Sequence, residues 1–312
     1  MIKIVFMGTP SFGVPILEGL YIQYKIVGVV TQPDKPVGRK QEVLFSPVKQ
    51  WAVKHCIKVF QPENIKTEYQ SIKELHPDLI VTAAYGQFVG MELLNYPKYR
   101  SINVHASLLP KYRGGAPIHQ AIKNGETETG ISIIYMEKKM DAGNILGSSK
   151  VPILETDTGG SLFEKLSLVG RDCLIKVIDQ MIQGTVKAIP QDESLATYAF
   201  NVSKEDERLD FSKTAFEVWN HIRAYNPTPG AYTTINGEVY KIYSSNISPM
   251  KHHQSLGSII DITKNSFVVA CGENTAIEIT QIKPQGKNIM NVQDFLNGNG
   301  KNILKNIEKV GA

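Results

Sequence analysis

The sequence predicts an α/β domain with a doubly wound, mostly parallel sheet, followed by a small β domain. Apolar strand patterns alternate with helical patterns in the first part, whereas short β runs between polar turns follow residue 205. A chain of 312 residues is also longer than one compact core usually holds. We expect a first domain at 1–183, a linker at 184–204 and a second domain at 205–312.

The strands of the first domain are expected where apolar runs stand between turn residues. Residues 2–7 form a continuous apolar run, which is typical of a strand buried in a parallel sheet. Apolar residues at helical spacing predict a long helix over 163–183. Further strands are expected at 24–31, 58–60, 78–83, 102–105 and 131–136, and shorter helices near 16–20, 47–54 and 73–76.

The second domain has a different pattern. An amphipathic helix is expected at 215–223, and Asn236-Gly237 is a strong hairpin turn. Several short strands with polar turns favour a small barrel, for which an OB-like β-barrel is one candidate. The β runs lie at 231–235, 238–243, 258–262, 266–270 and 276–282.

Composition excludes several classes of protein. Hydrophobic residues make up 42% and charged residues 21%, as in globular proteins, and no apolar run reaches the roughly 18 residues of a membrane span. The N-terminus lacks a signal-peptide pattern. The three cysteines, Cys56, Cys173 and Cys271, are far apart and have no metal-ligand spacing. We therefore expect a cytoplasmic protein without disulfides, metal or membrane contact.

The positive charge is local. The net charge is only +4, yet residues 31–58 contain Lys35, Arg39, Lys40, Lys49, Lys54 and Lys58 against Asp34 and Glu42, again +4. A basic loop of this kind fits contact with a polyanion. On charge alone, a solvated surface fits equally well.

Residues 103–110, Asn-Val-His-Ala-Ser-Leu-Leu-Pro, carry the chemistry. Asn103 and His105 are two apart, so on a strand both side chains point to the same face, and Pro110 ends the strand. An amide can donate to a developing oxyanion, and an imidazole can stabilise charge or move a proton. Asp141 is a candidate third member, because a carboxylate facing an imidazole orients the ring.

This constellation resembles the folate-dependent formyltransferases. The motif Asn-x-His-x-Ser-Leu-Leu-Pro-x-Tyr-Arg-Gly, an Asp-Ala-Gly whose acid lies 36 positions after the histidine, and residues 125–130 all match. Residues 6–12, 31–39, 223–227 and 285–287 are similar to the branch that formylates methionyl initiator tRNA. The resemblance implies a formyltransferase-type α/β domain, an OB-like domain that helps to hold tRNA, and a role in translation initiation.

The resemblance also implies roles for individual residues. Asn103, His105 and Asp141 would be catalytic, and 10-formyltetrahydrofolate would be the formyl donor, with no metal and no obligate protein partner. The loop at 31–39 would reach the acceptor stem of initiator tRNA through Arg39, Lys35 and Lys40. Folate would be bound by Ser107, Leu108, Leu109, Pro110, Tyr85, Gly86 and Gln87.

Other classes of protein fit the sequence less well. Formyltransferases that act on amino sugars share the trio, but they do not need a basic loop such as 31–39. A non-catalytic RNA-binding protein is disfavoured by the intact trio. Gly8-Thr9-Pro10 is a tight strand–helix turn without the dinucleotide glycine fingerprint, which argues against a nicotinamide-dependent oxidoreductase. Residues 85–89 fit an ordinary strand–helix loop as well as a folate wall.

Overall fold

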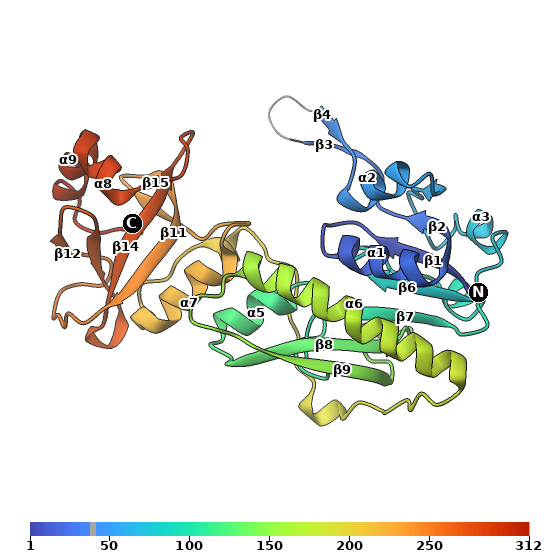
Figure 1. Ribbon diagram of the computed structural model, residues 1–312. Helices are drawn as coiled ribbons and strands as arrows, with labels where there is room; N and C mark the ends of the chain where they lie inside the picture. Colours follow the sequence, from blue (N-terminus) through green and yellow to red (C-terminus); the bar gives the residue numbers. More distant parts are fainter. Residues whose placement is uncertain (38–41, 312) are drawn as a thin grey trace. The chain divides into compact units, whose positions relative to one another are not determined.

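The computed structural model describes residues 1–37 and 42–311, which form two compact units (Figure 1). The predicted bounds at 1–183, 184–204 and 205–312 stay a prediction. The first unit contains Met1–Pro117, Glu128–Pro152 and Phe163–Phe200. The second contains Ile118–Thr127, Ile153–Leu162 and Asn201–Ala312.

The first unit is built on a seven-stranded sheet with the order β5-β2-β1-β6-β7-β8-β9. The first five strands of this order are parallel, and β8 and β9 add an antiparallel edge. The strands are β1 (Lys3–Gly8), β2 (Lys25–Val30), β5 (Val59–Phe60), β6 (Leu79–Ala83), β7 (Ser101–His105), β8 (Glu128–Tyr135) and β9 (Ile145–Pro152).

Helices cover the sheet, and its central strands are largely buried. Every residue of β6 is buried, as expected for a parallel strand covered on both faces. On α6 (Gly159–Gln183), Gly170 faces Val104 of β7, and Arg171 packs on Gly19 of α1 (Gly13–Gln23). The other helices are α2 (Pro47–Lys54), α3 (Gln70–Lys73), α4 (Met91–Leu94) and α5 (Pro117–Lys123).

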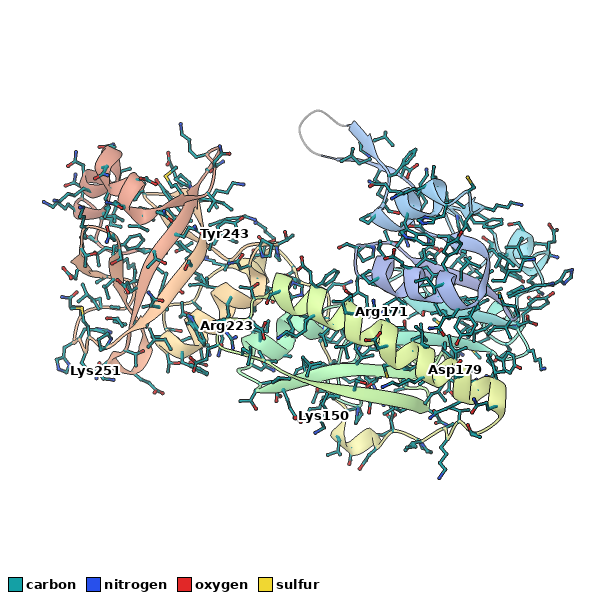
Figure 2. All side chains as sticks on the ribbon, viewed as in Figure 1. Lys150, Arg171, Asp179, Arg223, Tyr243 and Lys251 are labelled. Atoms are coloured by element: carbon teal, nitrogen blue, oxygen red, sulfur yellow. The ribbon has the colours of Figure 1, made fainter. Side chains whose placement is uncertain are left out.

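A hydrogen bond joins the end of α1 to α6. Tyr24, which caps α1, donates its hydroxyl to Asp179 Oδ1 at 2.8 Å, and Figure 2 labels Asp179 on α6. The long helix predicted at 163–183 is therefore present, and it contacts β7 and α1 near its middle and Tyr24 near its end. Its start at Gly159 lies one turn before the predicted one.

The parallel strands bring the predicted site residues to one edge. β1, β6 and β7 are neighbours, with Gly8 opposite Ala83 and Thr82 opposite Asn103. The carboxyl ends of parallel strands meet at the same edge of a sheet, where ligands bind in open α/β folds. The turn after β1, the loop after β6 and the motif on β7 are consequently adjacent.

The basic loop contains a strand pair that the sequence did not indicate. β3 (Lys35–Val37) pairs antiparallel with β4 (Glu42–Leu44). The base of this hairpin is anchored, because Asp34 forms an ion pair with Lys49 of α2. Both side chains of this ion pair are largely buried, with 20% of Asp34 and 13% of Lys49 exposed. The hairpin thus projects from a fixed base.

The second unit has a six-stranded antiparallel sheet with the order β10-β11-β14-β13-β12, in which β15 pairs with β14. Asn236 and Gly237 both have positive φ, of 52° and 75°, as a tight hairpin turn between β10 and β11 requires. The strands are β10 (Tyr232–Ile235), β11 (Glu238–Ser248), β12 (Ile259–Ile262), β13 (Phe267–Ala270), β14 (Ala276–Pro284) and β15 (Met290–Asn291).

Helix α7 (Ala215–Tyr225) organises the second unit. Thr214 and Glu217 form a capping box at its start. Arg223, labelled in Figure 2, donates to Asn220 Oδ1 at 2.8 Å and to the carbonyl of Leu154 at 2.9 Å. Further short helices are α8 (Val292–Phe295), α9 (Lys301–Lys305), the 3₁₀ turns Glu193–Leu195, Glu205–Glu207 and Gly272–Asn274, and a π-helical turn at Leu296–Gly300.

Most predicted elements of both domains are present. The helix 47–54 has the predicted bounds, whereas β9, β15 and the strands of the hairpin were missed. Only Leu146 and Val151 of β9 are buried, and the residues between them are Gly147, Ser148, Ser149 and Lys150, so its apolar signal is weak. Among the described residues, no helix is long and apolar enough to cross a membrane.

Candidate functional site

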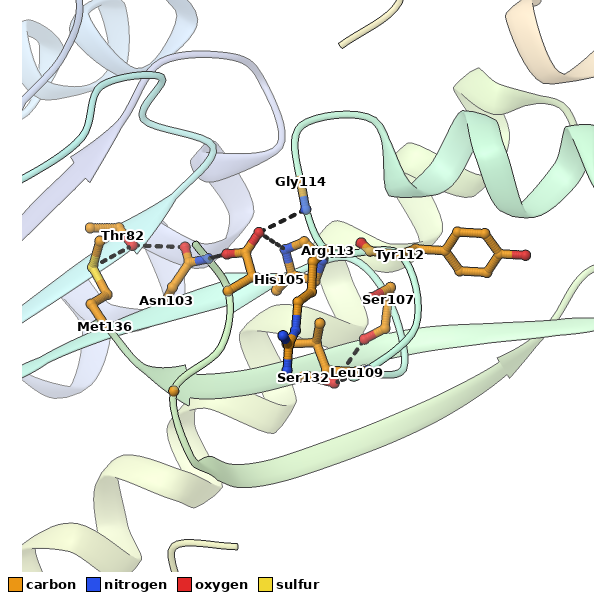
Figure 3. Close-up of polar contacts among 12 residues, drawn as sticks. Thr82, Asn103, His105, Ser107, Leu109, Tyr112, Arg113, Gly114, Ser132 and Met136 are labelled. Carbon is orange, nitrogen blue, oxygen red and sulfur yellow. Dashed lines mark hydrogen bonds and ion pairs between the residues drawn. The ribbon is translucent and has the colours of Figure 1, made fainter. Parts of the chain in front are cut away.

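Asn103 lies on β7, and a residue of the neighbouring strand orients its side-chain amide. The hydroxyl of Thr82, on the neighbouring strand β6, lies 2.7 Å from Asn103 Oδ1 (Figure 3). Because a hydroxyl can donate to this oxygen, the amide turns its nitrogen away from Thr82. Nδ2 then points toward Asp141, whose Oδ1 is 3.4 Å away. The N–H donors of Asn103 are therefore presented at the carboxyl edge of the sheet.

Asp141 is held in place by backbone as well as by side chains. Its Oδ2 accepts a hydrogen bond of 2.9 Å from the N–H of Gly114, in the turn that follows the motif (Figure 3). Its φ is 50°, a left-handed conformation that few residues other than glycine adopt, although aspartate tolerates it better than most. Two residues on, a Cβ at Gly143 would lie 1.9 Å from the carbonyl oxygen of Tyr135, so only glycine fits there.

His105 is buried and engaged through both ring nitrogens. Nε2 lies 2.9 Å from the carbonyl oxygen of Tyr112, and Nδ1 lies 3.6 Å from Asp141 Oδ2. A carbonyl oxygen only accepts, so Nε2 carries the hydrogen of that bond. In the imidazolium form, Nδ1–H would face the carboxylate of Asp141. The geometry thus suits a proton held between His105 and Asp141.

The structure brings the three predicted catalytic residues together. The side chain of His105 is 5% exposed and that of Asp141 is 14% exposed, while Asn103 is partly buried. Asn103 and Asp141 are therefore the members of the trio that reach solvent most readily. The arrangement provides an N–H donor, a carboxylate acceptor and an imidazole behind it, which is the set that an acyl-transfer step requires.

The turn predicted to bind folate is internally braced. Ser107 donates its hydroxyl to the carbonyl of Lys111 at 2.7 Å, and Ser132 bridges the turn by donating to Ser107 O and accepting from Leu109 N. Ser107 is fully buried, so its hydroxyl shapes the turn and does not face a ligand. Leu108 and Pro110 are partly buried. Contacts with a ligand would come from their apolar side chains and from backbone groups.

In the second predicted folate wall, the hydroxyl of Tyr85 is buried without a hydrogen-bond partner among the described residues, and the amide of Gln87 is bonded to neighbouring backbone. The ring of Tyr85 packs in a core cluster with Val5 and Ile80, and its hydroxyl is buried. Gln87 accepts from the N–H of Ile65 and donates to the carbonyl of Pro62. A wall formed here would consist of backbone atoms, and Gly86, with φ of 92°, is suited to such a turn.

The wall at 85–87 shares hydrogen bonds with the base of the basic hairpin. Gln32 donates to the carbonyl of Tyr85 at 3.1 Å and accepts from Gln87 at 3.4 Å. Thr9, in the turn after β1, also donates to Tyr85 O at 3.0 Å. These bonds join three loops at the carboxyl edge of the sheet, none of which was predicted to be connected.

Of the residues predicted to contact tRNA, the structure describes one. Lys35 is exposed and lies on β3, opposite Leu44. Arg39 and Lys40 fall within 38–41, outside the described residues. Their roles therefore stay predictions from the sequence.

Residues that support the trio were missed by sequence reasoning. Arg113, in the predicted basic turn, is fully buried, and it donates to Glu193 Oε1 at 2.8 Å and Oε2 at 3.1 Å. Lys139 forms a second ion pair with Glu193. Thr82 and Glu193 carried no motif that could have identified them, because their partners lie 21 and 80 positions away.

The described residues also bear on metal binding and on cavities elsewhere in the first unit. Within the described parts of the chain, no group of three or more His, Cys, Asp or Glu side chains could hold a metal ion. A cavity of about 560 Å³ lies between α1, α2 and α6, with Val14, Trp51 and Phe163 in its lining. The lining residues of this cavity do not include any member of the trio.

The ion pairs of Glu193 predict a pH dependence of stability. The guanidinium of Arg113, and then Lys139, lower the pKa of Glu193 from 4.5 to about 2. A lowered pKa in the folded state stabilises the protein above pH 4.5, and this contribution is lost as the pH falls toward 2. Glu193→Gln should lower the urea midpoint of the first unit, followed by Trp51 fluorescence, most strongly above pH 4.5.

The difference between wild type and Glu193→Gln should narrow as the pH falls from 4.5 toward 2. Glu18→Gln, which removes an exposed carboxylate from α1, is the control for the loss of one charge. A difference that stays constant over this pH range would contradict the assigned ion pairs.

The comparisons with known proteins agree with the resemblance. Residues 2–178 match the family described as "Formyl transferase", and residues 201–300 match "Formyl transferase, C-terminal domain". A relative from Geobacillus sp. (strain WCH70), named methionyl-tRNA formyltransferase, is 50% identical over 306 residues. The match covers 97% of this chain and 96% of the relative.

Solved structures share the fold. The N-formyltransferase of Helicobacter canadensis, in complex with folinic acid and dTDP-3-aminofucose, has a TM-score of 0.67 at 23% identity and covers 89% of this chain and 99% of that one. Methionyl-tRNA formyltransferase from Clostridium thermocellum has a TM-score of 0.58 at 15% identity, with 80% and 94% covered. The predicted fold class is confirmed, and the chain belongs to the formyl transferase family.

Proposed function

We propose that this protein transfers the formyl group of 10-formyltetrahydrofolate to the α-amino group of methionyl initiator tRNA. The observation that carries the chemistry is the meeting of Asn103 Nδ2, the Asp141 carboxylate and the His105 ring at the carboxyl end of β7. An amide donor beside a carboxylate and an imidazole supports transfer of an acyl group to an amine. The product would serve translation initiation in the cytoplasm.

The acceptor is inferred from the relatives. The full-length relative at 50% identity is named methionyl-tRNA formyltransferase, so we assign the same acceptor. An amino sugar is the acceptor to test against, because a structure with dTDP-3-aminofucose has the same fold. At 23% identity that structure shows the fold alone.

In the proposed reaction, the amine nitrogen attacks the formyl carbon, and the formyl oxygen becomes an oxyanion. Asn103 donates an Nδ2–H to this oxyanion, while Thr82 keeps Oδ1 turned away from it. A preorganised donor of this kind lowers the barrier by roughly 3–4 kcal/mol. The donor is in place before the charge develops, which is why it is effective.

The carboxylate and the imidazole account for the protons. Asp141 accepts the proton that the attacking amine loses, and the Asp141–His105 pair then shares this proton between Oδ2 and Nδ1, which lie 3.6 Å apart. When the bond from the formyl carbon to the folate nitrogen breaks, the pair returns one proton to that nitrogen. The amine thus loses one proton, the folate nitrogen gains one, and Asp141 and His105 end as they began.

The donor and the acceptor would be bound by different loops. Folate would lie between residues 107–110 and 85–87, and it would be held mainly by backbone groups. Arg39, Lys35 and Lys40 would contact the acceptor stem of the tRNA. A guanidinium can bond phosphates and base edges in a plane, whereas lysines act as point charges on the backbone. The domain bounds at 183 and 205 belong to this proposal, with the second domain helping to hold the tRNA.

The acceptor assignment predicts the outcome of a direct assay. Purified protein, given 10-formyltetrahydrofolate, should formylate charged initiator methionyl-tRNA, because the relatives with that name match over the whole chain. Uncharged tRNA and a dTDP-amino sugar are the parallel substrates. Transfer to the sugar but not to methionyl-tRNA would overturn the assignment.

The oxyanion role predicts the effect of one substitution. Asn103→Ala should lower kcat by roughly 10²–10³-fold, because the preorganised N–H donor is lost. The measurement is steady-state formylation, with circular dichroism to confirm the fold. Asn95→Ala removes an exposed asparagine at the end of α4 and should leave kcat unchanged. Normal turnover by Asn103→Ala would exclude the oxyanion role.

The basic loop predicts a selective effect on the tRNA substrate. Arg39→Ala should raise KM for initiator tRNA at least about tenfold and leave KM for folate unchanged, because a guanidinium that bonds phosphate or base contributes on the order of 1–3 kcal/mol. Lys25→Ala, at the exposed start of β2, is the control. Equal losses toward both substrates would contradict a tRNA contact at Arg39.

A further inference from the structure

A segment that the sequence presents as linker lies along the catalytic turn of the first unit. Arg113 donates its backbone N–H to Thr197 O at 2.8 Å and accepts from Ala199 N at 2.7 Å. Tyr112, whose carbonyl holds His105, donates its own N–H to Thr197 Oγ1 at 2.9 Å. Residues 189–199, called here the docked segment, therefore pair with the backbone that carries the site.

The contact with the catalytic turn is too close for another side chain. A Cβ at Gly114 would lie 2.5 Å from the carbonyl oxygen of Ala199, and the φ of Gly114 is 121°. Gly114 is also the residue whose N–H binds Asp141. The same glycine thus meets the docked segment on one side and the catalytic carboxylate on the other.

Gln191 of the docked segment bonds directly to the turn that contains Asp141. Its Nε2 donates to Asp141 O and to Gly143 O, both at 2.8 Å. These two bonds use both hydrogens of the amide nitrogen, and they close around the residue with φ of 50°. A left-handed non-glycine residue persists only when its surroundings hold it. Gln191 supplies that constraint from the side opposite Gly114.

Arg113 fixes the direction in which the Gln191 amide points. Its Nη2 and Nε donate to Gln191 Oε1 at 2.7 and 3.1 Å. Because the guanidinium only donates, the amide oxygen must face Arg113 and the amide nitrogen must face Asp141. Glu193 holds the other side of the guanidinium, which is fully buried. The orientation of Gln191 is therefore determined by Arg113, which is itself held by an ion pair with Glu193 of the docked segment.

We propose that Gln191 is a positioning residue for formyl transfer, and that it sets the Asp141 carboxylate against His105 and Asn103. This inference rests on the proposed function. Gln191 touches neither reacting group, and it acts through the backbone of the 141–143 turn. The catalytic centre is then complete only when the docked segment is in place.

The test substitution is Gln191→Glu. It keeps the side-chain length and the acceptor for Arg113, but it turns a carboxylate oxygen toward the carbonyls of Asp141 and Gly143. The repulsion displaces the turn, and a misplacement of about 1 Å at a catalytic group costs on the order of 100-fold in rate. We expect kcat to fall roughly 10–100-fold per folded enzyme, with KM for folate and for tRNA within about twofold of wild type.

A matched control lies in the same segment. Ser194→Ala removes an exposed hydroxyl that bonds only to Asp192 among the contacts described, and it should leave kcat unchanged. Gln191→Met, which has no donor and no charge, is the second variant if Gln191→Glu folds poorly. A purely structural role for Gln191 would lower the melting temperature without changing kcat per folded molecule, and that result would overturn the inference.

A second measurement does not depend on activity. The Gly114 N–H should be protected from hydrogen exchange in wild type, because it donates to Asp141 Oδ2, and its exchange should accelerate roughly tenfold or more in Gln191→Glu. The Leu109 N–H, bound to Ser132, is the internal reference. Unchanged exchange at Gly114 would overturn the inference. Wild-type protein without transfer to methionyl-tRNA would refute the proposed function, whereas the Gly114 comparison would still decide whether Gln191 holds Asp141.

Discussion

The proposed chemistry of this protein depends on how the carboxylate of Asp141 is held. Asp141 sits in a left-handed backbone conformation, accepts from the N–H of Gly114, and lies 3.4 Å from Asn103 Nδ2 and 3.6 Å from His105 Nδ1. Asn103 and His105 come from β7, Gly114 comes from the turn that follows it, and Asp141 itself lies after β8. A small movement of the 141–143 turn would therefore change every distance that defines the site.

The parallel sheet is what makes this convergence possible. β6 and β7 end at the same edge, so Thr82 can fix the amide of Asn103 from the neighbouring strand. The antiparallel β8 then returns past β7, and the turn between β8 and β9 delivers Asp141 to that edge. The motif on β7 therefore forms a site together with Thr82 of β6, the turn at Gly114 and the turn that contains Asp141.

Two glutamine side chains, Gln32 and Gln191, support the loops around the site in the same way. Gln32 joins the base of the basic hairpin to the loop after β6, and the docked segment joins the catalytic turn to Asp141 through Gln191 and Arg113. In both places a side-chain amide connects two loops, and a second contact fixes which way the amide points. The loops of the site are thus positioned by polar bonds, while the apolar core, which includes Val5, Ile80 and Tyr85, positions the strands.

The sequence by itself determined the strand and helix pattern, the family and the proposed catalytic trio, because periodicity and the spacing of Asn103, His105 and Asp141 can be read along the chain. It missed β9, whose central run of small and polar residues gives little apolar signal, and it presented residues 189–199 as part of a linker. Only the tertiary structure decided that Thr82, Arg113 and Gln191 support the trio and that the hydroxyls of Ser107 and Tyr85 face inward. Those contacts join residues up to 80 positions apart, and a hydrogen bond depends on distance and direction in space, which local sequence patterns do not encode.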